Sequence, residues 1–250
     1  MDVTHAVLIG LAALSAGAVN AIAGGGSLIT FPVLLASGLP AITASMTNTV
    51  AMCPGYLGAT LAQRRDLAGQ GARALRLVPL SLAGSLVGAW ILLNTTEKSF
   101  QTIVPFLLVF AAGLLVLQGK LRSYLVQHTR GGRSLTFAIL PVALSAVYGA
   151  YFGAGMGVII FAILAVVFED TLMRANALKQ LLSLIINTCA AVVFLFVGTV
   201  DWQVALIIAV SSLAGGLIGG KLASRIPEPL LRWLAIAVAL VVAAIYFAKL

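Results

Sequence analysis

Residues 81–89 read SLAGSLVGA, and residues 212–220 repeat them as SLAGGLIGG, with six of nine positions identical at an offset of 131 residues. The same offset relates residues on both sides of this stretch: Ala44 to Ala175, Glu97 to Glu228 and, with a small gap, Gly26 to Gly155. One stretch of small residues is common in membrane helices, but agreement over this length is not. The sequence therefore predicts an internal duplication.

The composition excludes a soluble globular protein. Only 9% of the 250 residues are charged and 61% are hydrophobic, and the mean hydropathy is +1.11. A soluble domain carries roughly 25% charged residues, so this chain lacks the polar surface that water requires. The sequence predicts an all-α membrane protein, a polytopic helical bundle.

Basic residues gather in short loops. The chain has 15 Lys and Arg against 7 Asp and Glu, an excess that in a soluble protein would suggest nucleic-acid binding. Here the basic loops Arg64 to Arg76 and Lys120 to Arg133 flank one hairpin, so they share a side, which the positive-inside rule makes cytoplasmic. No Lys or Arg precedes the first apolar run, so we read it as a retained span rather than a signal peptide. We expect a multi-pass protein of the cell inner (plasma) membrane, with both termini outside and no nucleic-acid partner.

Two uncharged stretches are punctuated in a way that predicts short or broken helices. A span needs about 20 apolar residues. The stretch between His5 and Arg64 could hold nearly three spans, and Asn20 to Ser27 and Gly38 to Pro40 divide it. The stretch from Ser134 to Phe168 exceeds one span and breaks at Gly149 to Gly157. The other expected helices cover residues 77–93, 100–117, 174–197, 203–222 and 230–247. Ten segments and eight full spans with two re-entrant segments fit equally well.

Equivalent loops of the two halves differ in charge. The basic loop Arg64 to Arg76 corresponds to a short loop that holds Asp201. We therefore expect one membrane domain of two inverted repeats, residues 1–118 and 135–250, joined by a basic cytoplasmic loop at 119–134. Inverted repeats are typical of secondary transporters, whose sites form near the midplane at broken helices in corresponding positions. The breaks at Gly24–Ser27 and Gly149–Gly157 should thus meet.

The first break is one part of the candidate substrate site. Asn20, Gly24, Gly25 and Ser27 surround the start of a half-helix, whose free N–H groups and partial positive charge attract an anion. The alternative is that the glycines only allow close helix packing. No Lys followed by Ser or Thr comes after them, so the motif is not a nucleotide-binding P-loop.

A polar stripe is the other part. Helical spacings of three and four connect Asn176, Lys179, Gln180, Ser183 and Asn187. Unpaired polar groups in lipid are costly, so this stripe should face protein or water. We assign the five residues to substrate binding. For Lys179, extension of the side chain to the membrane interface is the open alternative.

Thr47 and Asn48 are the first-half counterpart of the stripe, because Asn48 aligns with Lys179 at the 131-residue offset. We assign both to the substrate site, with interhelical hydrogen bonding as the alternative. Gly84, Gly88 and their copies have the spacing of helix-packing residues.

The positions of the acidic residues favour an anionic substrate. All seven lie in loops or at expected helix ends: Asp2, Asp66, Glu97, Glu169, Asp170, Asp201 and Glu228. A metal ion or amine would call for carboxylates inside the membrane. Cys53 and Cys189 lie in apolar runs without metal-site spacing. We expect neither a metal nor a cofactor.

The first break and its surroundings resemble the TauE/SafE family of sulfite exporters, also called the TSUP family of permeases. The similarity rests on Gly24-Gly25-Gly26-Ser27-Leu28-Ile29-Thr30-Phe31-Pro32-Val33-Leu34, on Gly38-Leu39-Pro40 and on Ala44-x-x-Thr47-Asn48. A weaker copy follows at Gly149 to Gly157 with Ala175-Asn176, so the resemblance covers nearly the whole chain. It implies a secondary transporter, an exporter working by alternating access, of a small sulfur-containing anion such as sulfite or an organosulfonate.

The second motif departs from the family pattern. Phe161-Ala162-Ile163 stands where a proline is expected after the glycines, and Lys179-Gln180 replaces a pair more like Thr-Ser. The resemblance therefore defines the family more firmly than the substrate.

A membrane-embedded enzyme or lipid carrier acting on an anionic head group is the alternative function. An enzyme would need paired carboxylates, a His cluster or an activated nucleophile at membrane depth. The sequence contains none in its apolar segments, so we expect no enzyme. The expected partners are the small anion and the lipid bilayer; whether two copies form a homodimer stays open.

Overall fold

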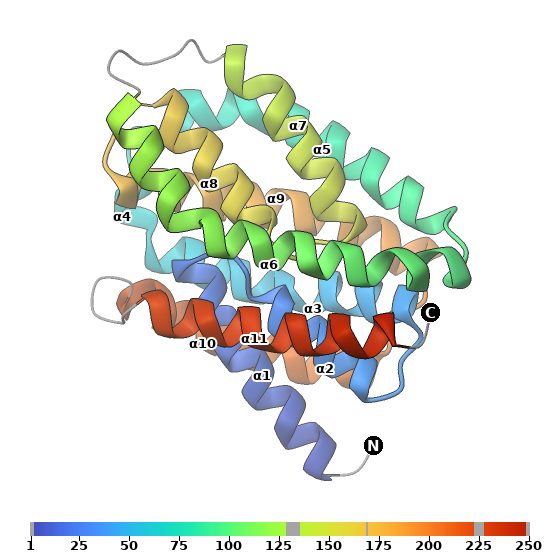
Figure 1. The fold of residues 1–250 in the computed structure, drawn as a ribbon. Coiled ribbons are helices and arrows are strands. Elements are labelled where there is room, and N and C mark those ends of the chain that lie inside the picture. Colours follow the sequence, from blue (N-terminus) through green and yellow to red (C-terminus); the bar gives the residue numbers. More distant parts are fainter. Residues whose placement is uncertain (1–2, 129–135, 169, 223–227, 249–250) are drawn as a thin grey trace.

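The computed structural model describes residues 3–128, 136–168, 170–222 and 228–248, and every regular element in these ranges is a helix. Figure 1 shows the helices packed side by side as one bundle. They are α1 (Val3–Ile22), α2 (Ser27–Ala36), α3 (Ala41–Ala62), α4 (Arg64–Leu67), α5 (Gly71–Leu93), α6 (Glu97–His128), α7 (Thr136–Tyr151), α8 (Met156–Val167), α9 (Leu172–Val197), α10 (Trp202–Leu222) and α11 (Glu228–Phe247). The all-α class predicted from composition is confirmed.

Five of the helices are long and apolar enough to cross a membrane: α1, α5, α6 up to Leu117, α9 and α10. The helices α2 and α8 have 10 and 12 residues, or roughly 15 and 18 Å at about 1.5 Å per residue, against about 30 Å of hydrocarbon. Both follow the predicted breaks. The short, broken helices expected from the glycine punctuation are therefore present in both halves.

Two predicted boundaries were wrong by six residues or more. Helix α5 begins at Gly71 rather than at residue 77, so Arg73 and Arg76 are helical, and α6 continues to His128 rather than ending at residue 117. Hydropathy marks where a helix becomes apolar, whereas the backbone hydrogen bonds continue past that point. Much of the basic loop predicted at 119–134 is thus helix, and residues 129–134 lie outside the described ranges.

The element order repeats at the offset seen in the sequence. Three pairs of helices begin 131 residues apart: α3 and α9 at Ala41 and Leu172, α5 and α10 at Gly71 and Trp202, α6 and α11 at Glu97 and Glu228. The earlier pair α2 and α8 begins 129 residues apart, because α8 is two residues longer. The small gap in the sequence repeat therefore falls at this pair of short helices. The inverted orientation of the halves stays a prediction.

Packing between the helices follows the same repeat. Helix α10 contacts both α1 and α3. Its counterpart α5 contacts both α7 and α9 in the same way. The counterparts α3 and α9 also contact each other. The repeated glycines lie in these contacts. A Cβ on Gly84 or Gly88 would strike the Ala143 or Val147 carbonyl of α7, and one on Gly215 would strike the Leu14 carbonyl of α1. These glycines allow close backbone approach, as the sequence predicted.

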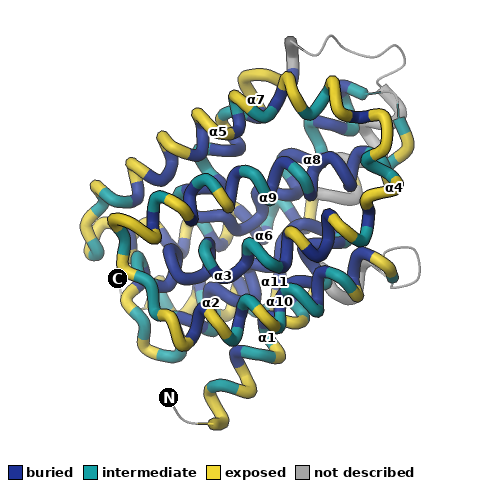
Figure 2. Tube along the Cα trace, turned by 180° about the vertical axis from the view of Figure 1, so that it is seen from behind, coloured by how far each residue is buried: buried dark blue, intermediate teal, exposed yellow. Residues whose placement is uncertain are grey.

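The distribution of side chains is that of a protein in lipid. Large apolar side chains such as Trp90 and Phe196 are exposed on the outside, whereas Asn, Gln, Ser, Thr and Lys side chains are buried. Figure 2 shows the buried residues running through the middle of the bundle and the exposed ones on its outer faces. Polar groups are thus kept from the hydrocarbon.

The two ends of the bundle are held by different polar contacts. At one end, on the left of Figure 1, lie α4, the end of α6 and the start of α11. There Asp170 accepts hydrogen bonds from Arg73 at 2.6 Å and from Arg174 at 2.9 Å. Toward the opposite end, Glu97 at the start of α6 accepts from the backbone N–H groups of Ala41 and Ile42 at the start of α3. Arg73 was expected in a solvated loop; it is instead partly buried in this ion pair.

Candidate functional site

The break between α1 and α2 is built around the side chain of Asn20. Its Oδ1 accepts a hydrogen bond from the Gly26 N–H at 2.7 Å. Gly24, between the two helices, has a φ of +90°, a conformation that favours glycine. One N–H that the sequence left free for an anion is therefore already used. The Asn20 side chain thus bridges the end of α1 and the residue before α2.

The polar stripe on α9 meets this break. The Lys179 ammonium and the Gln180 amide both donate to the Asn20 carbonyl, at 3.1 and 2.7 Å. Asn176 donates to the Ala21 carbonyl at 3.0 Å. The last carbonyls of a helix have no partner within it and carry its negative dipole end, so a buried cation and two amides stabilise the end of α1.

Lys179 does not extend to the membrane interface. Its side chain is 1% exposed, and its ammonium group lies inside the bundle at the broken helix. The interfacial anchor left open by the sequence is therefore excluded. A buried amine is costly and persists in membranes at functional positions.

The remaining stripe residues continue along the same side of α9. Asn187 donates to the Ser183 carbonyl at 2.9 Å, and both residues are buried. The Tyr56 side chain of α3, also buried, lies beside Asn20, Ser27 and Asn187. The structure thus gathers seven predicted residues: Asn20, Ser27, Asn176, Lys179, Gln180, Ser183 and Asn187.

The other predicted residues have different surroundings. Thr47 accepts from the Asp201 N–H at 3.0 Å, just before α10, and Asn48 accepts from the Thr30 hydroxyl at 2.6 Å. Gly25 faces Leu115, whose side chain a Cβ would strike. For Asn48 the interhelical hydrogen bond named as an alternative is observed, Thr47 bonds to the loop before α10, and Gly25 is closely packed. They stay in the proposal only as residues that shape the site.

Sequence reasoning missed Tyr56 and Gln63. Gln63 accepts from Asn176 at 2.8 Å and donates to the Ala21 carbonyl at 3.2 Å, so it completes the contact between α3, α9 and α1. Tyr56 lies eight residues after Asn48, on the same helix face, and that spacing could have identified it. Nothing in the sequence around Gln63 distinguishes it from other polar residues at helix ends.

The two breaks touch, as predicted. A Cβ on Gly24 would lie 2.9 Å from the Gly157 carbonyl carbon, and one on Gly157 would lie 2.9 Å from the Gly24 Cα. The second break has a different lining: the Tyr148 hydroxyl donates to the Ala154 carbonyl, and Phe152 packs edge-on against Phe31 at 5.2 Å. Depth in a bilayer is not fixed by these contacts.

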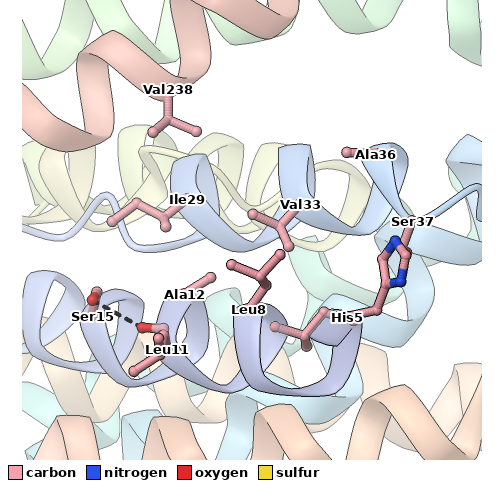
Figure 3. Close-up of a pocket in the computed structure, with 11 residues that line it drawn as sticks. His5, Leu8, Leu11, Ala12, Ser15, Ile29, Val33, Ala36, Ser37 and Val238 are labelled. Carbon is pink, nitrogen blue, oxygen red and sulfur yellow. Dashed lines mark hydrogen bonds between the residues drawn. The ribbon is translucent and has the colours of Figure 1, made fainter. Parts of the chain in front are cut away.

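An apolar groove of about 470 Å³ lies apart from these residues, between α1, α2 and α11. Figure 3 shows Leu8, Ile29, Val33 and Val238 lining it. Its polar lining residues are His5, Ser15 and Ser37, and the two serine hydroxyls donate to the Leu11 and Leu34 carbonyls at 2.9 and 2.7 Å. None of the predicted site residues lines the groove, so it suits lipid or apolar side chains rather than an anion. Within the described residues, no three His, Cys, Asp or Glu side chains gather as a metal site would require.

Comparison with known proteins identifies the family. The family model described as sulfite exporter TauE/SafE matches residues 9–246. A probable membrane transporter protein, ORF9, of a Sinorhizobium species is 30% identical over 234 residues, which is 92% of this chain and 89% of that protein. The probable membrane transporter protein YfcA of Escherichia coli K12 is 27% identical over 93% of this chain and 86% of that protein. No solved structure matches. The chain is a multi-pass membrane transporter and belongs to the TauE/SafE family.

Proposed function

We propose that this protein is a secondary transporter that exports a small sulfur-containing anion, sulfite or an organosulfonate, across the cell inner membrane. One observation carries the proposal: the Lys179 ammonium group is buried at the end of a broken helix, among amide and hydroxyl side chains. Hydrogen-bond donors and a single cation can replace the hydration of an oxyanion. Release stays possible because only one charge is engaged.

Both halves contribute to this position, which suits alternating access. Asn20 and Tyr56 come from the first half, and Lys179, Gln180 and Asn187 from the second. If the halves are inverted repeats, rocking of one against the other would open this position to each side in turn. The family and the named relatives support transport, and the word sulfite comes from the family description.

Contacts between the halves also close the site toward the basic end. Moving outward from Lys179, Asn176 bonds Gln63, Gln70 donates to the Arg174 carbonyl at 2.9 Å, and Arg73 pairs with Asp170. Each contact joins a residue before position 118 to one after position 135. In an alternating-access cycle these contacts would separate when the site opens to the cytoplasm.

Flux into proteoliposomes of the purified chain tests the proposal. Radiolabelled sulfite, sulfoacetate and taurine are compared with nickel and an uncharged amino acid as controls. We expect saturable flux of the sulfur anions that unlabelled sulfite inhibits. Preference for nickel or the amino acid would refute the anion site. Preference for a carboxylate over every sulfur compound would refute the sulfur assignment alone.

A further inference from the structure

The two amide side chains at the break have orientations that their backbone partners fix. Asn20 Oδ1 accepts from the Gly26 N–H, and Gln180 Nε2 donates to the Asn20 carbonyl. Turning either amide would place donor against donor or oxygen against oxygen at 2.7 Å. Amide orientation is often ambiguous, but here one answer satisfies the neighbours. Asn20 must therefore present Nδ2, and Gln180 must present Oε1, away from these partners.

Three buried polar atoms on α1 and α9 have no hydrogen-bond partner among the described residues: Asn20 Nδ2, Gln180 Oε1 and Ser183 Oγ. The Tyr56 side chain lies beside Asn20, whereas Gln180 Oε1 has no such neighbour within hydrogen-bonding distance in the described part of the chain. Their side chains are at most 1% exposed. Buried polar atoms are almost always paired, because an unpaired one keeps the full cost of its lost hydration. The unpaired acceptor of Gln180, next to the buried Lys179, points to a ligand that carries a hydrogen-bond donor as well as negative charge.

We infer that the substrate is an oxyanion that carries its own hydrogen-bond donor, and that Gln180 Oε1 accepts a hydrogen bond from this donor. The inference rests on the proposed function and narrows its substrate class. A fully deprotonated oxyanion offers only acceptors, so it would face Gln180 oxygen to oxygen. A hydroxyl or ammonium group on an organosulfonate, or the proton of hydrogensulfite, can donate to Gln180 while the anionic oxygens accept from Asn20 Nδ2.

Gln180 is thus a specificity-determining residue, and Lys179 supplies charge. Sites that bind a substrate hydroxyl discriminate strongly against analogues without it, because their polar atoms are then left unpaired. Ser183, one turn further along α9, can donate or accept and so fits either part of the ligand.

Calorimetric titration of the purified full-length chain with two matched sulfonates tests the inference. 2-Hydroxyethanesulfonate and ethanesulfonate share the anion and differ by one hydroxyl group. We expect the hydroxylated compound to bind the wild type at least tenfold more tightly. In Gln180→Met, which keeps the side-chain length but removes the acceptor together with the Nε2 donor to the Asn20 carbonyl, the ratio should fall to about one. Gln101→Met, at an exposed glutamine of α6, should keep the wild-type ratio.

Equal affinity of the wild type for both sulfonates would overturn the inference and leave the anion site standing. If Gln180→Met still bound the hydroxylated sulfonate more tightly, the inference would also be overturned, because another group would then accept the hydrogen bond from its hydroxyl. Binding of neither sulfonate to the wild type would remove the proposed sulfonate specificity and the inference with it. The wild-type ratio does not depend on any variant folding.

Discussion

The two broken helices share part of their backbone geometry and differ in chemistry. Each break precedes a short helix and contains a glycine with positive φ, Gly24 at +90° and Gly153 at +82°. The second break has another such glycine, Gly155 at +81°, whereas Gly26 in the first has a helical φ of −59°. The first is surrounded by Lys179 and Gln180. The second is held by Tyr148 and Phe152. The two halves thus share the break, whereas the polar side chains gather at the first one.

The crossing contacts show the same asymmetry. Asn176 of α9 donates to the Ala21 carbonyl at 3.0 Å, and its counterpart at the 131-residue offset, Ser45 of α3, reaches the Tyr151 carbonyl only at 3.5 Å. Asn48, the counterpart of Lys179, bonds Thr30 within its own half. A symmetric cavity would hold a ligand at two equivalent places. This arrangement favours one binding place, nearer to the first break.

The largest effect should come from the buried cation. Lys179→Met keeps most of the side-chain volume and removes the charge, so anion flux should fall by about a hundredfold or more, because a charge-assisted contact in a dry site contributes several kcal/mol. Initial rates in proteoliposomes measure this. The same change at the exposed Lys98 is the matched control and should leave flux near the wild-type value. Equal, small effects of both variants would show that the first break is not the polar site.

Removing the amide that closes the first break should come next. Asn20→Ala leaves the Gly26 N–H without its partner, so we expect a loss of about 1–3 kcal/mol of stability and a clear drop in flux. Tyr148→Phe removes the corresponding hydrogen bond at the second break and should reduce stability by a similar amount with less loss of flux. Thermal unfolding and flux are measured on both. If Tyr148→Phe impaired transport as much as Asn20→Ala, the asymmetry would be refuted.

The contact between the breaks can be tested with one methyl group. Gly24→Ala introduces strain from positive φ and a Cβ 2.9 Å from Gly157 backbone. Gly38 has nearly the same φ, +89°, with nothing within 4 Å of its Cβ position. Gly38→Ala should therefore cost about 1–2 kcal/mol from strain alone. Gly24→Ala should cost a few kcal/mol in total, seen as a lower thermal midpoint. Similar losses for the two variants would mean that the breaks separate easily.

The smallest effect concerns the starts of α3 and α9. Glu97 accepts hydrogen bonds from backbone N–H groups at the start of α3, whereas Asp170 pairs with two arginines at the start of α9. Burial alone would raise the pKa of Asp170, but hydrogen bonds from Arg174 and Arg73 outweigh it and lower this pKa from 3.8 to about 2. Because the pKa is lowered on folding, the stabilisation is complete above about pH 4 and disappears as the pH falls toward 2. Asp170→Asn should cost about 1–2 kcal/mol at pH 7, since both arginines are partly exposed.

Thermal unfolding of this variant and the wild type at pH 7 and pH 3 provides the measurement. The difference between the two proteins should shrink at the lower pH. Asp66→Asn, at a carboxylate of α4 that lies in the same basic region, is the control and should show little effect at either pH. A difference that does not change with pH would indicate that Asp170 acts through shape rather than charge.

Local sequence determined most of the fold. Hydropathy placed α9, α10 and α11 within two residues of their observed ends, because helix formation in lipid depends on the side chains of a single segment. The offset between the copies of SLAG equals the separation of three pairs of observed helix starts. Membership of the polar stripe followed from spacing on α9 alone. These properties are short-range, so one sequence was enough.

Only the tertiary structure decided what the polar groups contact. The sequence allowed Lys179 to reach either the interface or the interior, and packing of α9 against α1 placed its ammonium at the Asn20 carbonyl, 159 residues away along the chain. The sequence placed Arg73 in a basic loop, and only the structure shows that it pairs with Asp170. Gln63 and Tyr56 belong to the site because they contact residues of α1 and α9 that are far away in the sequence. The physical reason is that hydrophobic pattern fixes which face of a helix is buried, but the partner on that face depends on the crossing of helices from both halves.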